Sequence, residues 1–219
     1  MAPKVYVSPS SQTENTYAAG NTNEAVQCRR IAVALVESLI RCGIDAMTNI
    51  DDGVTMYDRA RESDAWGADL HVPVHTNAFN EILRGTRMFC YDLKGEGYKA
   101  SKAIFDELAP VVPGDSDAIK SAAFYEIRNT KAPCAYVEAA FHDHPEQAAW
   151  IISHTDPIAE AICKGICKYF GVAYVSPEVE KETIYRVQVG AYRSEEYALR
   201  MRDILKEEGY DAFVVATTK

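Results

Sequence analysis

The sequence predicts an α/β fold: a mostly parallel, twisted sheet flanked by helices, followed by a small C-terminal βαβ-like appendage. Short apolar runs alternate with segments of helical periodicity through most of the chain. The run ADLHVPVH at residues 68–75 is apolar almost throughout, which is typical of a strand buried on both faces of a sheet. A polar segment without periodicity, residues 173–182, then precedes a second strand and helix pattern. We therefore expect a main domain at residues 1–172, a linker, and a small module at residues 183–219.

The elements of the main domain follow from the apolar runs and from the residues that interrupt them. Residues 4–8 form a first strand, and a loop rich in Ser, Asn, Thr and Gly follows. A helical period begins near residue 21 and places Ile31 and Leu35 on one face, and Gly43 ends it. The further elements that we expect are strands at 44–47, 68–75, 86–92 and 134–139, and helices at 56–66, 98–108, 144–154 and 157–170.

The C-terminal module repeats this alternation on a smaller scale. TIYRVQVGAY at residues 183–192 alternates apolar and polar side chains, which indicates a strand. Ser194 caps a helix with acidic residues in its first turn, Gly209 ends that helix, and AFVV at residues 212–215 is expected to return as a strand. A unit of this length is too short to bury a hydrophobic core by itself.

Composition excludes several classes of function. The 219 residues carry a net charge of −9, so the chain lacks the basic face that nucleic acid requires. No apolar run reaches the roughly 18 residues that a membrane helix needs, and MAPKVYVSPSSQ does not have the pattern of a signal peptide. We therefore expect synthesis in the cytoplasm and no membrane insertion. The six cysteines lack CxxC spacing, and we expect all of them, Cys163 and Cys167 included, to pack as small apolar residues rather than to bind a metal.

Three side chains are candidates for a metal and catalytic site. His75 lies at the exit of a buried parallel strand, and the carboxyl edge of such a sheet is where α/β proteins place their sites; the alternative is a histidine that merely ends the strand. Glu24 lies in the first turn of the first helix, where a carboxylate also complements the helix dipole. Glu138 lies near the end of an otherwise apolar strand, where an acidic side chain is costly to bury unless it is paired or functional. Together they suggest zinc with a general base.

Two longer segments carry a family resemblance. RARESDAWGADLHVPVHTNAF and YEIRNTKAPCAYVEAAFHDH resemble the histidine and glutamate segments of the zinc-dependent N-acetylmuramoyl-L-alanine amidases of cell-wall turnover and phage lysis. Arg128, Pro133, Glu138 and Phe141 fall on matching positions, and the likeness covers roughly residues 4–171. The resemblance implies that Glu24 and His75 bind Zn²⁺ and that Glu138 is the catalytic carboxylate. It also implies that peptidoglycan is the substrate.

The chain departs from the family at its first strand. The family has Asp-Pro-Gly-His-Gly there, and the histidine is a zinc ligand, whereas this chain has SPSSQ with Ser11 in the histidine's place. His142, four residues beyond Glu138, is our candidate for the replacement ligand, with Gln12 as the alternative ligand or as a group that binds the peptide stem. Two further roles are expected. Arg128 would steady the developing oxyanion or bind a stem carboxylate, with a structural ion pair as the alternative, and Asn77 is assigned to substrate binding or to shaping its loop.

The tail resembles half of a SPOR domain, a module that binds peptidoglycan glycan strands. Tyr185, Gln188, Gly190 and Tyr192 match the opening strand of that family, whose domain has two such halves. The second half would then come from another copy of the chain, which gives a homodimer. We expect a phage or prophage endolysin that acts at the cell wall after release. The alternative is an inactive peptidoglycan-binding protein that keeps the amidase fold.

Overall fold

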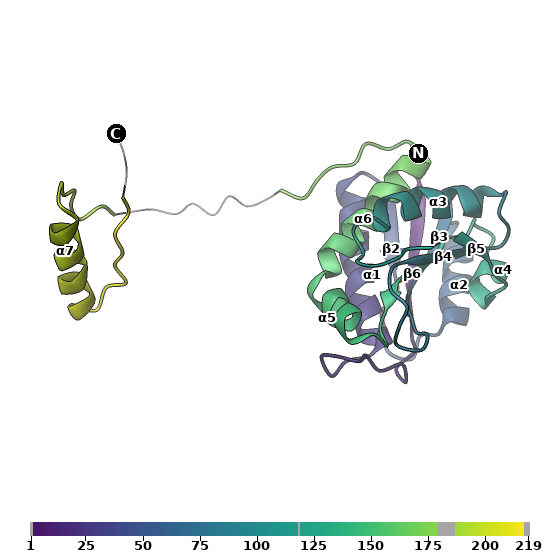
Figure 1. Ribbon diagram of the computed structural model, residues 1–219. Coiled ribbons are helices and arrows are strands. Elements are labelled where there is room, and N and C mark those ends of the chain that lie inside the picture. The colour runs from purple at the N-terminus through teal and green to yellow at the C-terminus, as the bar shows by residue number, and fades with distance from the viewer. Residues whose placement is uncertain (1, 118, 179–186, 217–219) are drawn as a thin grey trace. The chain divides into compact units, whose positions relative to one another are not determined.

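The computed structural model describes residues 2–117, 119–178 and 187–216 (Figure 1), and it divides into two units, residues 1–177 and 178–219. The first unit therefore extends past residue 172, where we expect the main domain to end. Its elements are β1 (Lys4–Pro9), α1 (Glu24–Arg41), β2 (Asp45–Thr48), α2 (Met56–Trp66), β3 (Leu70–Asn77), β4 (Arg87–Cys90), α3 (Glu96–Leu108), β5 (Ile119–Ser121), α4 (Tyr125–Asn129), β6 (Tyr136–Phe141), α5 (Pro145–Ser153) and α6 (Thr155–Phe170).

The strands form one six-stranded sheet in the order β2-β1-β3-β6-β4-β5. All neighbouring pairs are parallel except β4 and β6, which are antiparallel. The predicted α/β class with a mostly parallel sheet is thus confirmed. Sequence periodicity does not reveal β5 and α4, because 3 and 5 residues are too few to show a repeat.

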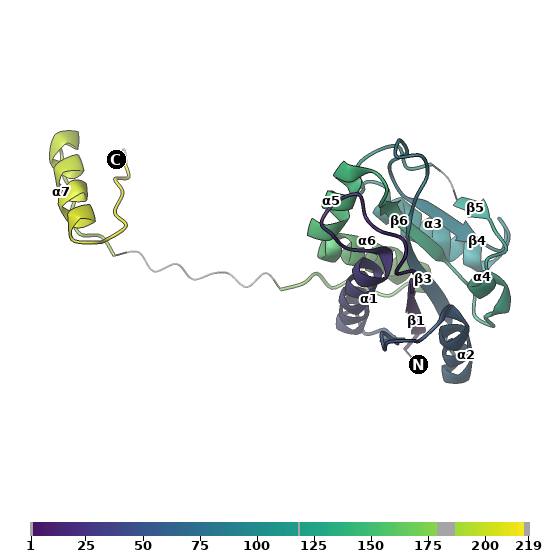
Figure 2. The ribbon, with the colours of Figure 1, turned by 90° about the horizontal axis from the view of Figure 1, so that it is seen from below.

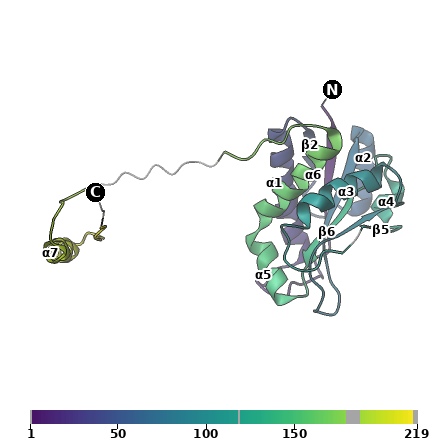
Figure 3. The same cartoon turned by 45° about the horizontal axis from the view of Figure 1, so that its top comes forward.

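Helices cover both faces of the sheet. Figures 1 and 2 show α1, α3 and α6 on one face and α2 and α4 on the other, and Figure 3 shows α1, α6 and α3 side by side. Alternate residues of β3 therefore meet different layers. Leu70, Val72 and Val74 join the core under α1, α3 and α6, whereas His71 and His75 point to the opposite face. This alternation places His75 outside the main core, near the carboxyl end of its strand.

Two local features position the elements around the site. Asn23 caps α1, and its side chain accepts a hydrogen bond from Val26 N, so Glu24 stands at the first residue of the helix, facing the carboxyl ends of the strands. Gly165 lets α6 approach α3 closely, because a Cβ atom at that position would lie 2.3 Å from Ile104 Cα. This close approach sets the spacing between α3 and α6, and α1 packs against α6 in the same layer.

In the second unit, the structure contains one described helix, α7 (Glu195–Glu207), none of whose residues is buried. The strands expected at 183–192 and 212–215 are not present in their described parts: residues 187–192 and 212–215 form neither a helix nor a paired strand. Residues 183–186, Tyr185 among them, lie outside the described residues. A strand needs a partner for its backbone hydrogen bonds, and the described residues of this unit supply none. Within the described residues, no helix is long and apolar enough to cross a membrane.

Candidate metal and catalytic site

Glu24 and His75 meet at the carboxyl edge of the sheet. Glu24 Oε1 lies 2.8 Å from His75 Nδ1 and 3.4 Å from the Thr76 backbone nitrogen. Both side chains are buried, Glu24 to 1% exposure and His75 to 9%. Residues 51 positions apart thus form a carboxylate and imidazole pair, because the start of α1 and the end of β3 converge there.

The surroundings favour the charged forms of this pair. Burial alone would raise the pKa of Glu24, but hydrogen bonds from His75, Asn15 and Ser10 and the charge of His75 outweigh it and lower the pKa of Glu24. Burial likewise opposes a charge on His75, but the hydrogen bond to Glu24 and the nearby carboxylates raise the pKa of His75. A cation at this position would therefore meet an ionised carboxylate and could displace the imidazole proton.

Glu138 lies beside the pair on the neighbouring strand. It is the register partner of His75 in the parallel β3 and β6 pair, so both side chains leave the same face of the sheet from backbones about 4.8 Å apart. Its Oε2 atom has no hydrogen-bond partner among the described residues. Burial, opposed by His75 and assisted by Glu24, raises the pKa of Glu138 to about 8. A carboxyl group that exchanges its proton near neutral pH has the property that a general acid and base needs.

The loop after β1 contributes two amide side chains. Asn15 Nδ2 donates to Glu24 Oε2 at 2.6 Å and to Gln12 Oε1 at 3.0 Å. Gln12 Nε2 lies 3.4 Å from His75 Nδ1, so Gln12 borders the pair, whereas Ser11 is exposed. Sequence reasoning missed Asn15, because an asparagine in a polar loop has no pattern that sets it apart.

His142 does not join Glu24 and His75. Its Nδ1 atom contacts Thr76 Oγ1 at 2.9 Å, and its ring stacks on Tyr17 at 5.2 Å between centroids. No described group of three His, Cys, Asp or Glu residues that includes Glu24 and His75 has its ligand atoms within 4.8 Å. The backbone explains this position. His142 N donates to Asn77 O at 2.8 Å, so residue 142 continues the pairing of β6 with β3. This pairing sets the direction in which the His142 ring leaves the backbone, toward Thr76.

Arg128 and Asn77, the other two residues expected to take part in the site, make no contact with Glu24 or His75 among the described hydrogen bonds. Arg128 is exposed on α4. Asn77 accepts a hydrogen bond from Ala78 N at 2.8 Å through its own side chain, so the structure gives it a contact that shapes the loop.

Two groups of residues around the site have no signal in the sequence. Tyr136 stacks on His75 with 4.6 Å between ring centroids and forms an aromatic wall for the imidazole. Glu126, on the short helix α4, accepts hydrogen bonds from Ser8 and from His71 Nε2 beneath the site. Each contact depends on which faces of strands and helices meet, so spacing along the chain could not reveal it.

The residues present fit zinc in part. A carboxylate oxygen and an imidazole nitrogen are ligands that zinc prefers, and a catalytic zinc site has three protein ligands and one open position. Glu24 and His75 supply two, and the unpartnered Glu138 Oε2 lies beside them as the base that such a site uses. Among the described residues that contact the pair, the neutral amide of Gln12 is the candidate for the third position. The donor chemistry therefore supports a weak zinc site with an unusually open coordination sphere.

A comparison with known protein families finds a match for each of the two units. Residues 8–168 match the family Amidase_3, described as N-acetylmuramoyl-L-alanine amidase. Residues 176–219 match the SPOR domain family.

Similar proteins agree with these matches. The N-acetylmuramoyl-L-alanine amidase CwlM of Bacillus licheniformis is 24% identical over 97% of this chain and 84% of its own length. A sporulation-specific N-acetylmuramoyl-L-alanine amidase of Bacillus subtilis strain 168 is 22% identical over the same shares. The catalytic domain of CwlV, an amidase from Bacillus (Paenibacillus) polymyxa var. colistinus, superimposes with a TM-score of 0.70 at 16% identity and covers 78% of this chain and 99% of that domain. At this identity, the superposition establishes the fold.

Proposed function

Because the chain belongs to the N-acetylmuramoyl-L-alanine amidase family, we propose that it hydrolyses the amide bond between N-acetylmuramic acid and the L-alanine of the peptidoglycan stem peptide. The observation that carries this proposal is the contact between Glu24 and His75 at the carboxyl edge of the sheet, with the proton-exchanging carboxyl of Glu138 beside it. An acyl transfer to water needs these two elements: a place that polarises the carbonyl and a group that moves a proton.

The proposed roles follow from position. Glu24 and His75 would hold a zinc ion, which when bound lowers the pKa of a water molecule to about 7 and polarises the scissile carbonyl. Glu138 takes one proton from the attacking water and returns it to the nitrogen of the departing L-alanine as the C–N bond breaks. The products are the lactyl carboxylate on the glycan and a stem peptide with a free amine. Asn15 keeps Glu24 oriented by its 2.6 Å hydrogen bond.

Two further side chains are assigned to substrate. Gln12 borders the metal pair and presents its amide nitrogen toward His75, which suits a hydrogen bond to a carbonyl of the stem peptide; as a weak third ligand it would use its carbonyl oxygen instead. Arg128 is exposed on α4, the helix whose Glu126 contacts His71 of β3, so its guanidinium is assigned to a stem carboxylate.

The experiment is digestion of purified peptidoglycan with zinc supplied. We expect turbidity to fall, and stem peptides with free L-alanine amines to appear without new reducing sugars. Glu138→Gln should abolish both signals and leave the fold intact by circular dichroism, whereas Glu37→Gln, at an exposed position on α1, serves as the matched control. New reducing ends, or digestion by Glu138→Gln at the wild-type rate, would refute the assignment.

The missing third ligand favours one alternative function. A chain that keeps the fold and the tail without binding zinc would be an inactive peptidoglycan-binding protein. Metal analysis separates the two proposals: about one zinc per chain that depends on Glu24 supports the enzyme. A full-length protein that sediments with the wall but holds no zinc at the Glu24 and His75 site and releases no peptide supports the binder.

The tail is proposed to hold the enzyme on glycan strands and to pair with a second copy of the chain. Residues 176–219 match the SPOR domain family, and α7 has no buried residue, so the described residues of its own unit do not fully cover its apolar stripe of Ala198, Met201, Ile204 and Leu205. Analytical ultracentrifugation at micromolar concentration tests the pairing, and a monomer there rules it out.

The cellular setting is proposed to be phage or prophage lysis. The relative from Bacillus subtilis is sporulation-specific by name, so sequence likeness does not distinguish the two settings. Expression in the host with and without a membrane-permeabilising protein tests the proposal. Lysis that requires the permeabilising partner supports release to the wall at the end of a lytic cycle.

A further inference from the structure

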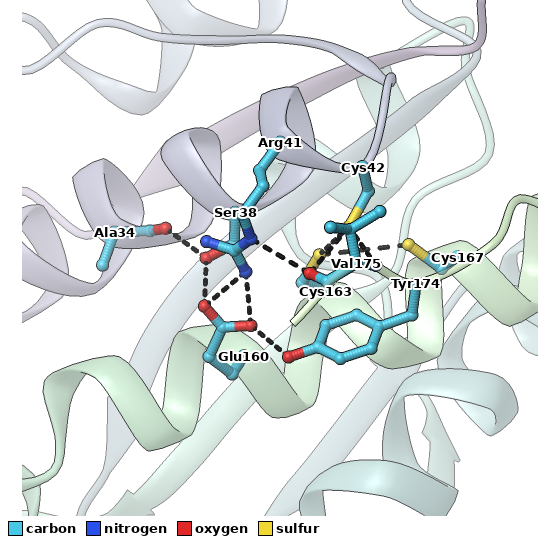
Figure 4. Close-up of polar contacts among 9 residues, drawn as sticks. All are labelled: Ala34, Ser38, Arg41, Cys42, Glu160, Cys163, Cys167, Tyr174 and Val175. Carbon is cyan, nitrogen blue, oxygen red and sulfur yellow. Dashed lines mark hydrogen bonds and ion pairs between the residues drawn. The ribbon is translucent and has the colours of Figure 1, made fainter. Parts of the chain in front are cut away.

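Three cysteine thiols lie together on the side of the domain where its last residues pack. Cys42 follows the last turn of α1, and Cys163 and Cys167 lie one turn apart on α6. Cys163 Sγ is 3.8 Å from Cys42 Sγ and 4.0 Å from Cys167 Sγ. Figure 4 shows the three sulfur atoms close together between the two helices and the segment of chain that contains Val175.

The cluster is buried and isolated from the proposed catalytic site. The three residues are 7%, 0% and 1% exposed, and their sulfur atoms all lie within 4.8 Å of one another. No other group of three His, Cys, Asp or Glu ligand atoms meets that distance in the described part of the chain. Nothing in the proposed amidase chemistry uses these thiols.

The separations of Cys163 Sγ from the other two sulfur atoms match those that a single ion would impose. Zinc to sulfur bonds of about 2.3 Å at tetrahedral angles place the sulfur atoms about 3.8 Å apart. The backbone oxygen of Val175 lies 3.7 Å from Cys42 Sγ, at a position that suits a fourth, oxygen ligand. The backbone nitrogen of Val175 also donates to Cys42 Sγ, at 3.3 Å, so both polar backbone atoms of Val175 contact this sulfur.

From this geometry we propose that Cys42, Cys163 and Cys167 bind one thiophilic d¹⁰ cation, Zn²⁺ in the first place, and that the bound ion fastens the end of the first unit to α1 and α6. Soft thiolate ligands select Zn²⁺ and Cu⁺ over the hard cations. Zn²⁺ with three thiolates leaves a net charge of −1, against −2 for Cu⁺, so the buried position favours zinc.

Neighbouring side chains already hold the segment at Tyr174 and Val175 in place through hydrogen bonds. Arg41 Nε donates to Val175 O at 3.0 Å, and Arg41 Nη2 contacts both carboxylate oxygens of Glu160 at 2.6 and 2.7 Å. Tyr174 donates to Glu160 Oε2 at 2.6 Å. The segment is therefore held in place before an ion arrives, and the guanidinium lies close enough to lower the cost of a negative cluster.

Binding would release protons. Burial raises the pKa of Cys167 to about 11 and raises the pKa of Cys163 further, so these two thiols carry protons in the absence of an ion. Each Zn–S bond to these two sulfur atoms then replaces an S–H bond, and the two protons go to solvent. We expect the affinity to rise with pH for this reason.

The test uses Cd²⁺ as the probe on the reduced full-length protein after chelation. Cadmium bound to thiolates gives an ultraviolet charge-transfer band that a carboxylate and imidazole site does not give, so the readout is independent of the amidase site. We expect the band to saturate at one equivalent, Zn²⁺ to displace it, and proton release to accompany it. Cys42→Ala and Cys163→Ala should each lose the band, whereas Cys134→Ala, at a buried cysteine elsewhere, and Glu24→Gln should keep it.

Three results would overturn the proposal. One is a wild-type protein with six titratable thiols and no band, which would mean that the thiols only pack as apolar groups. Another is a band that persists in both Cys42→Ala and Cys163→Ala. The third is the mass loss of a disulfide in protein purified without reductant, with no metal bound before or after reduction. Circular dichroism shows whether each variant is folded. Because Cys42 and Cys163 lie at different helices, one variant still tests the proposal if the other does not fold.

Discussion

Replacing Glu138 by glutamine should stabilise the metal-free protein at alkaline pH while it abolishes hydrolysis. The pKa of the Glu138 carboxyl rises from 4.5 to about 8 in the folded state, because burial disfavours its charge. At about 1.36 kcal/mol per pH unit, that rise lowers the free energy of unfolding by up to roughly 5 kcal/mol once the carboxyl ionises. The side chain is not fully shielded from solvent, so we expect about half of this value, ~2–3 kcal/mol.

The sign of the effect depends on pH. Below pH 4.5 the carboxyl is protonated in both states, and the burial has no ionisation cost. Between pH 4.5 and about 8 the unfolded chain releases the proton that the folded chain retains, so the stability of the wild type falls as pH rises. Glutamine mimics the protonated group and removes this dependence.

Urea denaturation, followed by tryptophan fluorescence with a chelator present, measures the effect at about pH 5 and about pH 8.5. We expect the wild type and Glu138→Gln to be similar at the lower pH and the variant to be more stable at the higher pH. The Glu37→Gln control should behave as the wild type. A variant that loses stability as steeply as the wild type, or that is less stable at the higher pH, would refute the burial argument.

The remaining predictions concern packing, the metal and the tail. Gly165→Ala should lower the free energy of unfolding by ~1–3 kcal/mol, although alanine favours helices, because the new Cβ atom would lie 2.3 Å from Ile104 Cα; an unchanged or higher melting temperature contradicts this. Asn15→Ala should weaken zinc affinity by about 10- to 100-fold through the lost hydrogen bond to Glu24, measured by competition with a zinc indicator, with Glu14→Ala as the exposed control. Equal affinities in the two variants would show that Asn15 does not support the ligand. A chain that ends at residue 177 should keep its melting temperature but sediment less with peptidoglycan, and equal sedimentation would assign wall binding to the first unit.

Most of the fold could be predicted from the sequence because its long elements repeat a pattern. The expected helix at 56–66 has the same bounds as α2, and the apolar run at 68–75 corresponds to β3, which is buried on both faces. The antiparallel pairing of β4 with β6 and the short α4 were not accessible, because pairing direction and five-residue helices leave no periodic signal.

The candidate site was likewise predictable only in part. Glu24 and His75 could be placed together from one rule, that helix starts and strand ends meet at the carboxyl edge of a parallel sheet. The position of His142 could not, because the direction of its ring depends on whether the backbone continues pairing past Phe141.

The thiol cluster shows most clearly what spacing along the sequence cannot reveal. Spacing reveals that Cys163 and Cys167 share a helix face, and two thiols alone gave no reason to expect a metal. The third sulfur comes from Cys42, which is 121 residues away from Cys163. Only the packing of α1 against α6 brings it into contact.

The central claim, a zinc ion held by Glu24 and His75 within reach of Glu138, is tested most directly by an anomalous-difference map recorded at the zinc edge from crystals grown with zinc. We predict a peak that contacts Glu24 Oε1 and His75 Nδ1 and lies beside the Glu138 carboxyl. A map without a peak at that position, whether or not one is present among Cys42, Cys163 and Cys167, would contradict the claim.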